Sequence, residues 1–271
     1  MPKSPPRSLT SPETRIKAHL QTLKLTRMAE HLDDVLTQAT RDQLPATHVL
    51  ERLLEVETGA HLERRIERRI HEAKLLERKL LSDFDFAFQT GIDKRQILEL
   101  ATLGFIERKQ GLILGGNSGT GKSHIAKALL LLACQNNYRC RYVTASDMLK
   151  DLLAGLADTT LGNKLKKYLS PDVLLIDELG FDRLEQEEAQ HRNASLFHKV
   201  IDGRYCKGST LVTINIDFQV LGDYLGDPVM TTAIVDRMVH HSIILSISGP
   251  SWRKHQSKEL NDLSRAADTT L

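Results

Sequence analysis

The residues of this chain that most clearly predict chemistry form a phosphate-binding loop near its middle. Residues 116–123 read GNSGTGKS and satisfy the pattern G-x-x-x-x-G-K-[ST]. Glycines let such a loop curl so that successive N–H groups point at phosphate oxygens, and the following helix adds its dipole. In this pattern the lysine reaches the β- and γ-phosphates, and the last hydroxyl binds Mg²⁺. The predicted nucleotide-binding residues are Gly116, Asn117, Ser118, Gly119, Thr120, Gly121, Lys122, Ser123 and His124.

The sequence around the loop supports this interpretation over a chance match in a glycine-rich turn. The apolar letters LIL precede the loop, and HIAKALLLLA follows it. A short buried strand before the loop and a helix after it are the context that the mechanism needs. We therefore expect ATP and Mg²⁺ as cofactors, with Ser123 as one magnesium ligand.

Two adjacent acids follow a second apolar stretch, PDVLLIDELG. They stand where this predicted strand ends, and ligands of open α/β sheets bind at the carboxyl ends of strands. Asp177 is expected to hold Mg²⁺, and Glu178 to polarise a water molecule that attacks the γ-phosphate. The alternative is an acid pair that caps the next helix. The pair favours water as the phosphate acceptor, which predicts hydrolysis rather than a metabolic kinase.

A third strand, within STLVTINIDF, ends in the polar residues Thr213 and Asn215. A polar side chain at that position can hold the attacking water and sense the γ-phosphate, and Asn215 is our candidate. The alternative is an asparagine that only forms the turn after the strand.

Two arginines near the C-terminal end are further candidates. Arg237 stands on a helical stretch before the last predicted strand, and it is either a surface arginine paired with Asp236 or an arginine finger offered to a neighbouring subunit. Such a finger adds roughly 10³–10⁵ to the rate of phosphate transfer. Arg253, in SGPSWRK, is a second candidate phosphate contact, with an ordinary surface arginine as the alternative.

The elements that must position these residues alternate between strand and helix. The candidate strands are short, apolar and rich in branched residues, as expected for parallel strands buried on both faces: GLILGG, CRYVTA, VLLIDE, STLVTIN and SIILSIS. This pattern predicts an α/β domain with a parallel sheet and flanking helices over residues 111–271.

The N-terminal third has a different texture. Residues 1–9 are rich in proline, serine and basic residues and are expected to lack fixed structure, whereas 10–82 predict a small all-helical domain. Its helical patterns cover 10–35, with a slip near Leu25, and 47–81, with a possible interruption at Gly59. Residues 83–110 are expected to form a linker, whose phenylalanines dock on the next domain, and one leading helix.

A basic helix in this third predicts a nucleic-acid contact. A helical projection puts Leu62, Ile66 and Ile70 on one face and basic side chains within about 100° on the opposite face. The alternative is a solvated, salt-bridged face. A stripe along DNA phosphates would read no sequence. The candidate DNA-binding residues are Arg64, Arg65, Arg68, Arg69, Arg78 and Lys79.

Composition excludes several classes. The net charge is only +2, but residues 1–82 hold 15 lysines and arginines against 12 acids, so the basic excess lies in this third. The three cysteines match no metal motif, and buried, unreactive thiols are expected for Cys134 and Cys140. No secretory signal or membrane span is recognisable, which predicts a cytoplasmic protein.

Taken together, these motifs resemble the IstB-type transposition helper ATPases, relatives of the DnaC helicase loaders within the AAA+ class. The resemblance covers nearly the whole chain, and its most specific parts are DFDFAFQ in the linker, GDP with DR before the last strand, and SWR. It implies a P-loop AAA+ fold, with Lys122 and Ser123 in Walker A and Asp177 and Glu178 in Walker B. It also implies Asn215 as sensor 1, Arg237 as arginine finger and Arg253 as a sensor-2-like arginine.

The resemblance also implies partners: duplex DNA, a cognate transposase and further copies of the chain in an ATP-dependent ring or spiral. Two departures weaken the match at the last arginine. In VTIN, an isoleucine stands directly before the Asn, where the family more often has a Thr or Ser, and Trp252 stands where a tyrosine is usual. A helicase loader acting on a helicase and single-stranded DNA is the alternative function. Few aromatic residues lie outside the linker and core, so a stacking platform for single strands is not evident.

Overall fold

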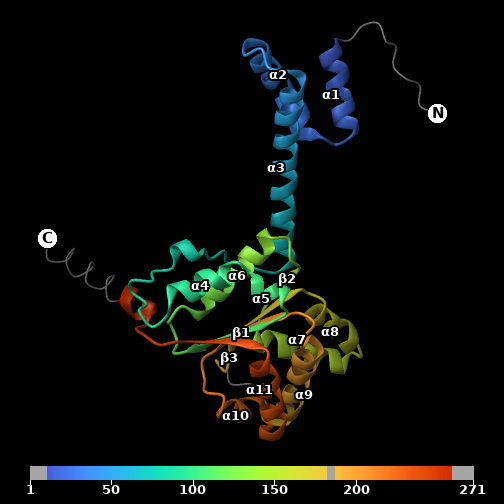
Figure 1. The fold of residues 1–271 in the computed structure, drawn as a ribbon. Coiled ribbons are helices and arrows are strands. Elements are labelled where there is room, and N and C mark those ends of the chain that lie inside the picture. The colour runs from blue at the N-terminus through green and yellow to red at the C-terminus, as the bar shows by residue number, and fades with distance from the viewer. Residues whose placement is uncertain (1–10, 182–186, 258–271) are drawn as a thin grey trace, which may run out of the picture. The chain divides into compact units, whose positions relative to one another are not determined.

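The structure is a computed structural model that describes residues 11–181 and 187–257, with no account of the side chains of 187–191. It divides into two compact units, Met1–Arg68 and Arg69–Leu271, and the division falls inside helix α3 (Ala46–Glu72). Figure 1 follows the chain through both. The sequence had placed the end of the helical region at residue 82. The expectation for residues 1–9 lies outside the described residues.

The first unit is helical, as expected from its apolar spacing. Helix α1 (Pro12–Thr22) begins at Ser11, whose Oγ accepts the N–H of Thr14 at 3.2 Å. Helix α2 (Thr26–Arg41) follows after a break, because Lys24 adopts a left-handed conformation with φ of 60°. The predicted slip near Leu25 is therefore a true break between two helices. The small core of this unit contains Leu20 of α1, Met28 and Leu32 of α2, and Leu53 of α3.

Helix α3 differs from the prediction at both doubtful points. It runs through Gly59 without interruption, and it ends at Glu72 rather than near residue 81. Lys74 has φ of 59°, and the N–H of Leu75 donates to the carbonyl of Ile70. These are the marks of a Schellman ending, in which apolar residues on either side of the turn pack together. Ile70 and Leu75 are both buried.

The early end of α3 overturns part of the predicted basic stripe. Arg78 and Lys79 follow the helix instead of continuing it, so they do not share a helical face with Arg64 and Arg68. The apolar spacing that predicted helix through residue 81 continues in the sequence, but Leu76 is 93% exposed and Leu80 is 46% exposed.

The second unit is built on a five-stranded sheet in the order β2-β3-β4-β1-β5, with every pairing parallel. All five predicted strands are confirmed: β1 (Gly111–Gly116), β2 (Cys140–Thr144), β3 (Val173–Leu179), β4 (Ser209–Ile214) and β5 (Ser242–Ile247). The expectation of burial on both faces holds for the central strands but is wrong for β5. This edge strand leaves Ile244 46% exposed.

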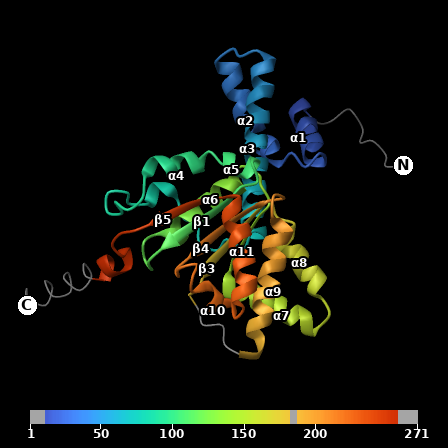
Figure 2. The same cartoon turned by 60° about the horizontal axis from the view of Figure 1, so that its bottom comes forward.

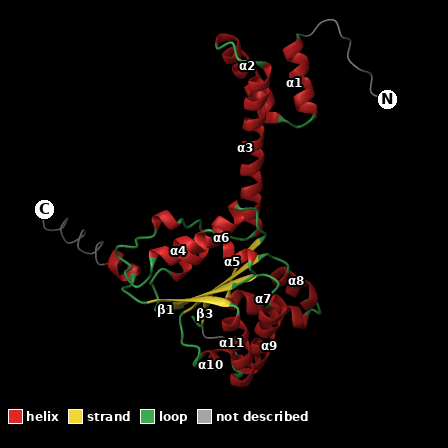
Figure 3. Ribbon diagram, in the orientation of Figure 1, coloured by secondary structure: helices red, strands yellow, loops and turns green. Residues whose placement is uncertain are grey.

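Helices cover both faces of this sheet, as Figures 2 and 3 show. On one face lies α6 (Lys122–Gln135), together with α4 (Lys94–Ala101) and α5 (Gly104–Glu107). The single helix predicted over 94–110 is therefore two, because Leu103 between them has φ of 63°. The other face carries α7 (Ala145–Ala157), α8 (Leu161–Leu169), α9 (Glu187–Arg204), α10 (Leu221–Leu225) and α11 (Pro228–His240).

Two further expectations concern the whole chain. Cys134 and Cys140 are buried free thiols, as predicted, while Cys206 is exposed. Within the described residues, no helix is both long and apolar enough to span a lipid bilayer.

Candidate nucleotide site

The predicted phosphate-binding loop joins the end of β1 to the start of α6 and lines a pocket of about 660 Å³. Lys122, at the first turn of α6, donates from Nζ to the carbonyls of Gly116 and Asn117, both at 2.7 Å. Burial lowers the pKa of Lys122 to about 8, although the charge of Asp177 acts in the opposite direction. The lysine is therefore held inside the curl of the loop, where it can exchange carbonyl for phosphate oxygens.

Two glycines show why the loop needs residues without a side chain. Gly121 has φ of +95°, and a Cβ there would stand 2.4 Å from the ring of Phe84. Gly119 has φ of +82°, and its Cβ would stand 2.1 Å from Oγ of Ser251. Both positions combine left-handed backbone with a close neighbour from another segment, so only glycine fits.

The buried carboxylate of Asp177 lies directly behind the loop. It is 1% exposed, and its Oδ1 accepts from Ser123 Oγ at 2.7 Å and from Thr213 Oγ1 at 2.5 Å. Its Oδ2 accepts from the hydroxyl of Tyr142 at 3.3 Å. A serine hydroxyl beside a carboxylate is a hard-oxygen pair of the kind that Mg²⁺ prefers, so the predicted magnesium ligands Ser123 and Asp177 fit that ion.

Glu178 faces the pocket because strand β3 is irregular at that point. Between Ile176 and Leu179 strand β3 gains one residue relative to β4, and Glu178 in this bulge has φ of 62°. Thr213 holds the bulge, since its Oγ1 accepts the N–H of Glu178 at 2.9 Å. A bulge re-aims the side chain that it carries. Here Glu178 becomes part of the pocket lining beside the buried Asp177.

The two polar residues at the carboxyl end of β4, Thr213 and Asn215, have different surroundings. Asn215 lines the pocket, and its N–H donates to the carbonyl of Leu179 at 3.2 Å. Thr213 is 1% exposed, and its hydroxyl forms hydrogen bonds with both acids of β3, to Asp177 Oδ1 and from the N–H of Glu178.

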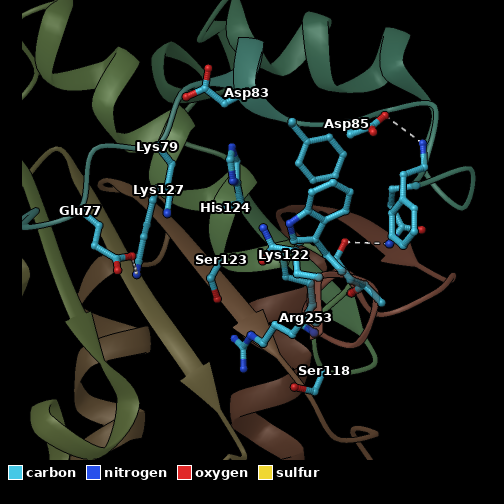
Figure 4. Close-up of a pocket in the computed structure, with 18 of the residues that line it drawn as sticks. Glu77, Lys79, Asp83, Asp85, Ser118, Lys122, Ser123, His124, Lys127 and Arg253 are labelled. Carbon is cyan, nitrogen blue, oxygen red and sulfur yellow. Dashed lines mark hydrogen bonds and ion pairs between the residues drawn. The ribbon is translucent and has the colours of Figure 1, made fainter. Parts of the chain in front are cut away.

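The C-terminal segment closes another side of the pocket, as Figure 4 shows. The N–H of Trp252 donates to the carbonyl of Gly119 at 3.0 Å, and Arg253 lines the pocket with its charge close enough to affect Lys122. Gln89, which is buried, fastens this segment to the loop. Its Nε2 donates to the carbonyls of Thr120 at 3.0 Å and of Pro250 at 3.3 Å.

The aromatic residues of the linker form the remaining wall. The rings of Phe84 and His124 pack edge-to-face with their centroids 5.5 Å apart, and those of Phe88 and Trp252 do so at 4.9 Å. The expectation that the linker docks its phenylalanines on the ATPase domain is thus met at these two positions. Aromatic and apolar rings at the rim of a phosphate site can pack against the flat base of a nucleotide.

Comparison with known proteins agrees with this geometry. Residues 18–260 match the family described as IstB-like ATP binding protein. The chain belongs to this family. The chain is 33% identical to the insertion sequence IS232 putative ATP-binding protein of Bacillus thuringiensis subsp. berliner, over 90% of this chain and 97% of the relative. It is 34% identical to the insertion sequence IS21 putative ATP-binding protein of Pseudomonas aeruginosa, over 91% of each.

Solved structures share the fold of this IstB-like chain. The DnaC helicase loader matches with a TM-score of 0.51 and 19% identity, over 65% of this chain and 99% of the loader. AMPPCP-bound DnaA from Aquifex aeolicus matches with a TM-score of 0.53 and 19% identity, over 69% of this chain and 56% of DnaA. The predicted P-loop AAA+ fold is confirmed, and the family described as IstB-like ATP binding protein supports nucleotide binding by this chain.

Arg237 of the IstB-like chain lies away from the nucleotide pocket. Its Nε is 2.8 Å from Oδ1 of Asp202, and its Nη1 donates to Nε2 of His198 at 2.9 Å. These partners lie on α9, whereas the alternative interpretation of the sequence had paired Arg237 with Asp236. It lines a small cavity with Gly111 and Ser242, the first residues of β1 and β5. The P-loop follows the other end of β1, so Arg237 does not face the pocket of its own chain.

The predicted DNA-binding residues separate into two groups. Arg64, Arg65 and Arg68 gather around a hollow of about 480 Å³ in the first unit, and Arg64 also pairs with Glu57 at 3.2 Å. The other three lie in the second unit. Arg69 forms an ion pair with Glu72 through Nη1 and donates from Nε to Oδ1 of Asn137, both at 3.4 Å. Lys79 lines the nucleotide pocket.

Three residues in or beside the pocket were not predicted from the sequence. Gln89 stood within the linker motif DFDFAFQ, whose specificity was a usable signal. Lys127 and Tyr142 had none, because their places beside Asp177 depend on how α6 and β2 pack against β3.

Proposed function

We propose that this chain hydrolyses ATP with Mg²⁺ in the cytoplasm, assembles with ATP on duplex DNA and helps a transposase to engage its target. The observation that carries the proposal is the position of Glu178, which lines the pocket one residue after Asp177 holds the hydroxyl of Ser123. A carboxylate at that point can accept a proton from a water molecule that attacks the γ-phosphate.

The remaining residues of the pocket have complementary tasks in this proposal. Lys122 binds the β- and γ-phosphates, while Ser123 and Asp177 hold Mg²⁺, which neutralises charge on the phosphate oxygens when it is bound. Asn215 orients the attacking water, and Arg253 contacts the phosphates from the C-terminal segment. The chain itself thus supplies binding, orientation and a proton acceptor, which is most of what phosphoryl transfer requires.

Self-assembly is proposed from the place of Arg237. This side chain is one-third exposed and lies at the amino edge of the sheet, so it can complete a site only on another copy of the chain. A ligand that binds at the interface between copies stabilises the assembly by mass action. ATP would then favour a ring or spiral of several chains.

DNA binding is proposed for the first unit. Arg64, Arg65 and Arg68 lie close together on α3, and three cations on one surface suit the phosphates of duplex DNA. The partner transposase is proposed from the relatives, whose names place them in insertion sequences. The likeness to a helicase loader supports only the fold, at 19% identity.

The proposal is tested by measuring binding to duplex and single-stranded DNA of equal length, with and without ATP, across a salt series. Light scattering on the same samples reports assembly size. We expect salt-sensitive duplex binding and large assemblies only with ATP. Replacing Arg64, Arg65 and Arg68 by alanine should reduce the slope of log affinity against log salt by about 0.9 per lost phosphate contact. Replacing Arg27, Arg41 and Arg52 of the same unit is the matched control.

Binding to single strands alone would contradict the proposal and favour the helicase loader. If the slope of log affinity against log salt is unchanged in the triple variant, the three arginines of α3 do not contact DNA phosphates and form a solvent-exposed face instead.

A further inference from the structure

Residues 73–80, which we call the connector, lead from the end of α3 to the linker and lie against the helix that follows the P-loop. The connector is fastened at three points. The carbonyl of Ala73 accepts the N–H of Tyr142 at 2.7 Å, and Glu77 Oε2 lies 3.0 Å from Lys127 Nζ. The carbonyl of Leu80 accepts from His124 Nε2 at 2.7 Å. The last two contacts bind the connector to the first two turns of α6.

These contacts determine where Lys79 lies. It stands between Glu77 and Leu80, the two residues tied to α6, and it is half-buried and part of the nucleotide pocket lining. Figure 4 shows its side chain pointing into the pocket on the side of Ser123 and His124. The sequence pattern had suggested a DNA contact for this lysine, on the assumption that α3 continued through it.

The other cations of the pocket explain what Lys79 faces. Lys127 is occupied by Glu77 and lies 3.9 Å from Asp177 Oδ2, so its charge is compensated by acids. Lys122 is buried in the P-loop, and Arg253 approaches from the C-terminal segment. Lys79 therefore adds a cation from a third direction. The lining also holds the acids Glu77, Asp83, Asp85 and Glu178, and Glu77 is bonded to Lys127. Cations that approach the phosphate-binding loop from several directions can together bind the phosphates of a nucleoside triphosphate.

We infer that Lys79 binds the phosphates of the nucleotide, so that the connector forms a wall of the ATP site. This inference rests on the proposed function. It assigns a binding role to a residue outside the Walker motifs, in the stretch that continues directly from α3. The ties through Glu77 and His124 make Lys79 a prepositioned contact, which loses less conformational entropy on binding than a free lysine would.

The test is equilibrium binding of a non-hydrolysable ATP analogue with Mg²⁺, in the absence of DNA. Lys79→Met should weaken binding by about tenfold, the change expected when one charge-assisted hydrogen bond is lost. Lys74→Met is the matched control, because it removes the same group from an exposed position on the same connector, outside the pocket. It should bind as the parental chain does. Lys79→Arg retains the charge and should recover most of the affinity.

The outcomes separate the inference from the proposed function. If the parental chain fails to bind the analogue, the proposed function as an ATPase is refuted. If the parental chain binds and Lys79→Met binds equally well, only the inference is overturned. A loss that Lys79→Arg does not recover, or that Lys74→Met shares, also overturns it, because charge at Lys79 would not be the cause. Melting temperatures without nucleotide should be equal for all four proteins.

Discussion

Thr213 is a sensitive point in the site, because one hydroxyl orients both acids. Its Oγ1 donates to Asp177 Oδ1 at 2.5 Å and accepts the N–H of Glu178 at 2.9 Å, in a site that is 1% exposed. Thr213→Val keeps the shape and removes both bonds. A buried donor left without a partner costs about 1–3 kcal/mol, and loss of a bond to a charged group costs a similar amount. Since valine recovers some apolar packing, we expect the free energy of unfolding to fall by about 2–3 kcal/mol.

The same substitution should reduce hydrolysis more than nucleotide binding. The two hydrogen bonds of the Thr213 hydroxyl go to Asp177 and Glu178 and not to Lys122 or the loop glycines, so affinity for ATP should change little. The bulge that aims Glu178 would lose its hydrogen bond, and a misplaced general base costs roughly 10²-fold or more in rate. Chemical denaturation measures the first effect, and steady-state ATPase assays with titrated ATP measure the second.

Thr213→Ser is the control, because it retains the hydroxyl and loses only a methyl group. It should hydrolyse ATP at nearly the parental rate. Parental hydrolysis by Thr213→Val, or equal damage from serine and valine, would refute the reasoning, since the hydroxyl would then not be what positions the acids.

Three further outcomes follow from the structure. Glu178→Gln should bind ATP and keep it in a stable assembly, and hydrolysis at the parental rate would remove Glu178 as the base. Arg237→Ala should bind ATP but lose stimulated hydrolysis, and mixing it with Lys122→Ala should restore part of the activity; no recovery would count against action between subunits. Arg204 is 2% exposed and donates to the carbonyls of Tyr168, Pro171 and Ser209 at 2.7–3.0 Å. Arg204→Leu should therefore lower the free energy of unfolding by about 3 kcal/mol or more, and a change below about 1 kcal/mol in denaturant melts would show that those carbonyls find other partners.

Much of the ATPase fold was predictable, because its signals are local in the sequence. Each strand is a short apolar run between turn residues, so its existence depends on neighbours within a few positions. The P-loop is equally local, since glycines, lysine and serine act through backbone geometry at fixed spacing. Asp177 and Glu178 followed from the rule that ligands bind at the carboxyl ends of parallel strands.

Helix ends were less predictable, because several chain conformations satisfy the same apolar spacing. The pattern through Leu76 and Leu80 continues the period of α3, yet the helix stops at Glu72. Packing of Ile70 with Leu75, and the bond from Tyr142 to the carbonyl of Ala73, favour the turn. Those partners lie on β2 and in the core, which no local pattern reveals.

The sequence by itself determined that this chain has a nucleotide site, which residues form its phosphate-binding loop, and that Asp177 and Glu178 are the acids of the site. Only the tertiary structure decided how those residues are held and what else joins them. Thr213 reaches both acids because β4 pairs with β3 across a bulge, and Lys79 enters the pocket because the connector is tied to α6. Both facts depend on contacts between residues far apart in the chain, and such contacts are set by packing of the whole domain rather than by any short motif.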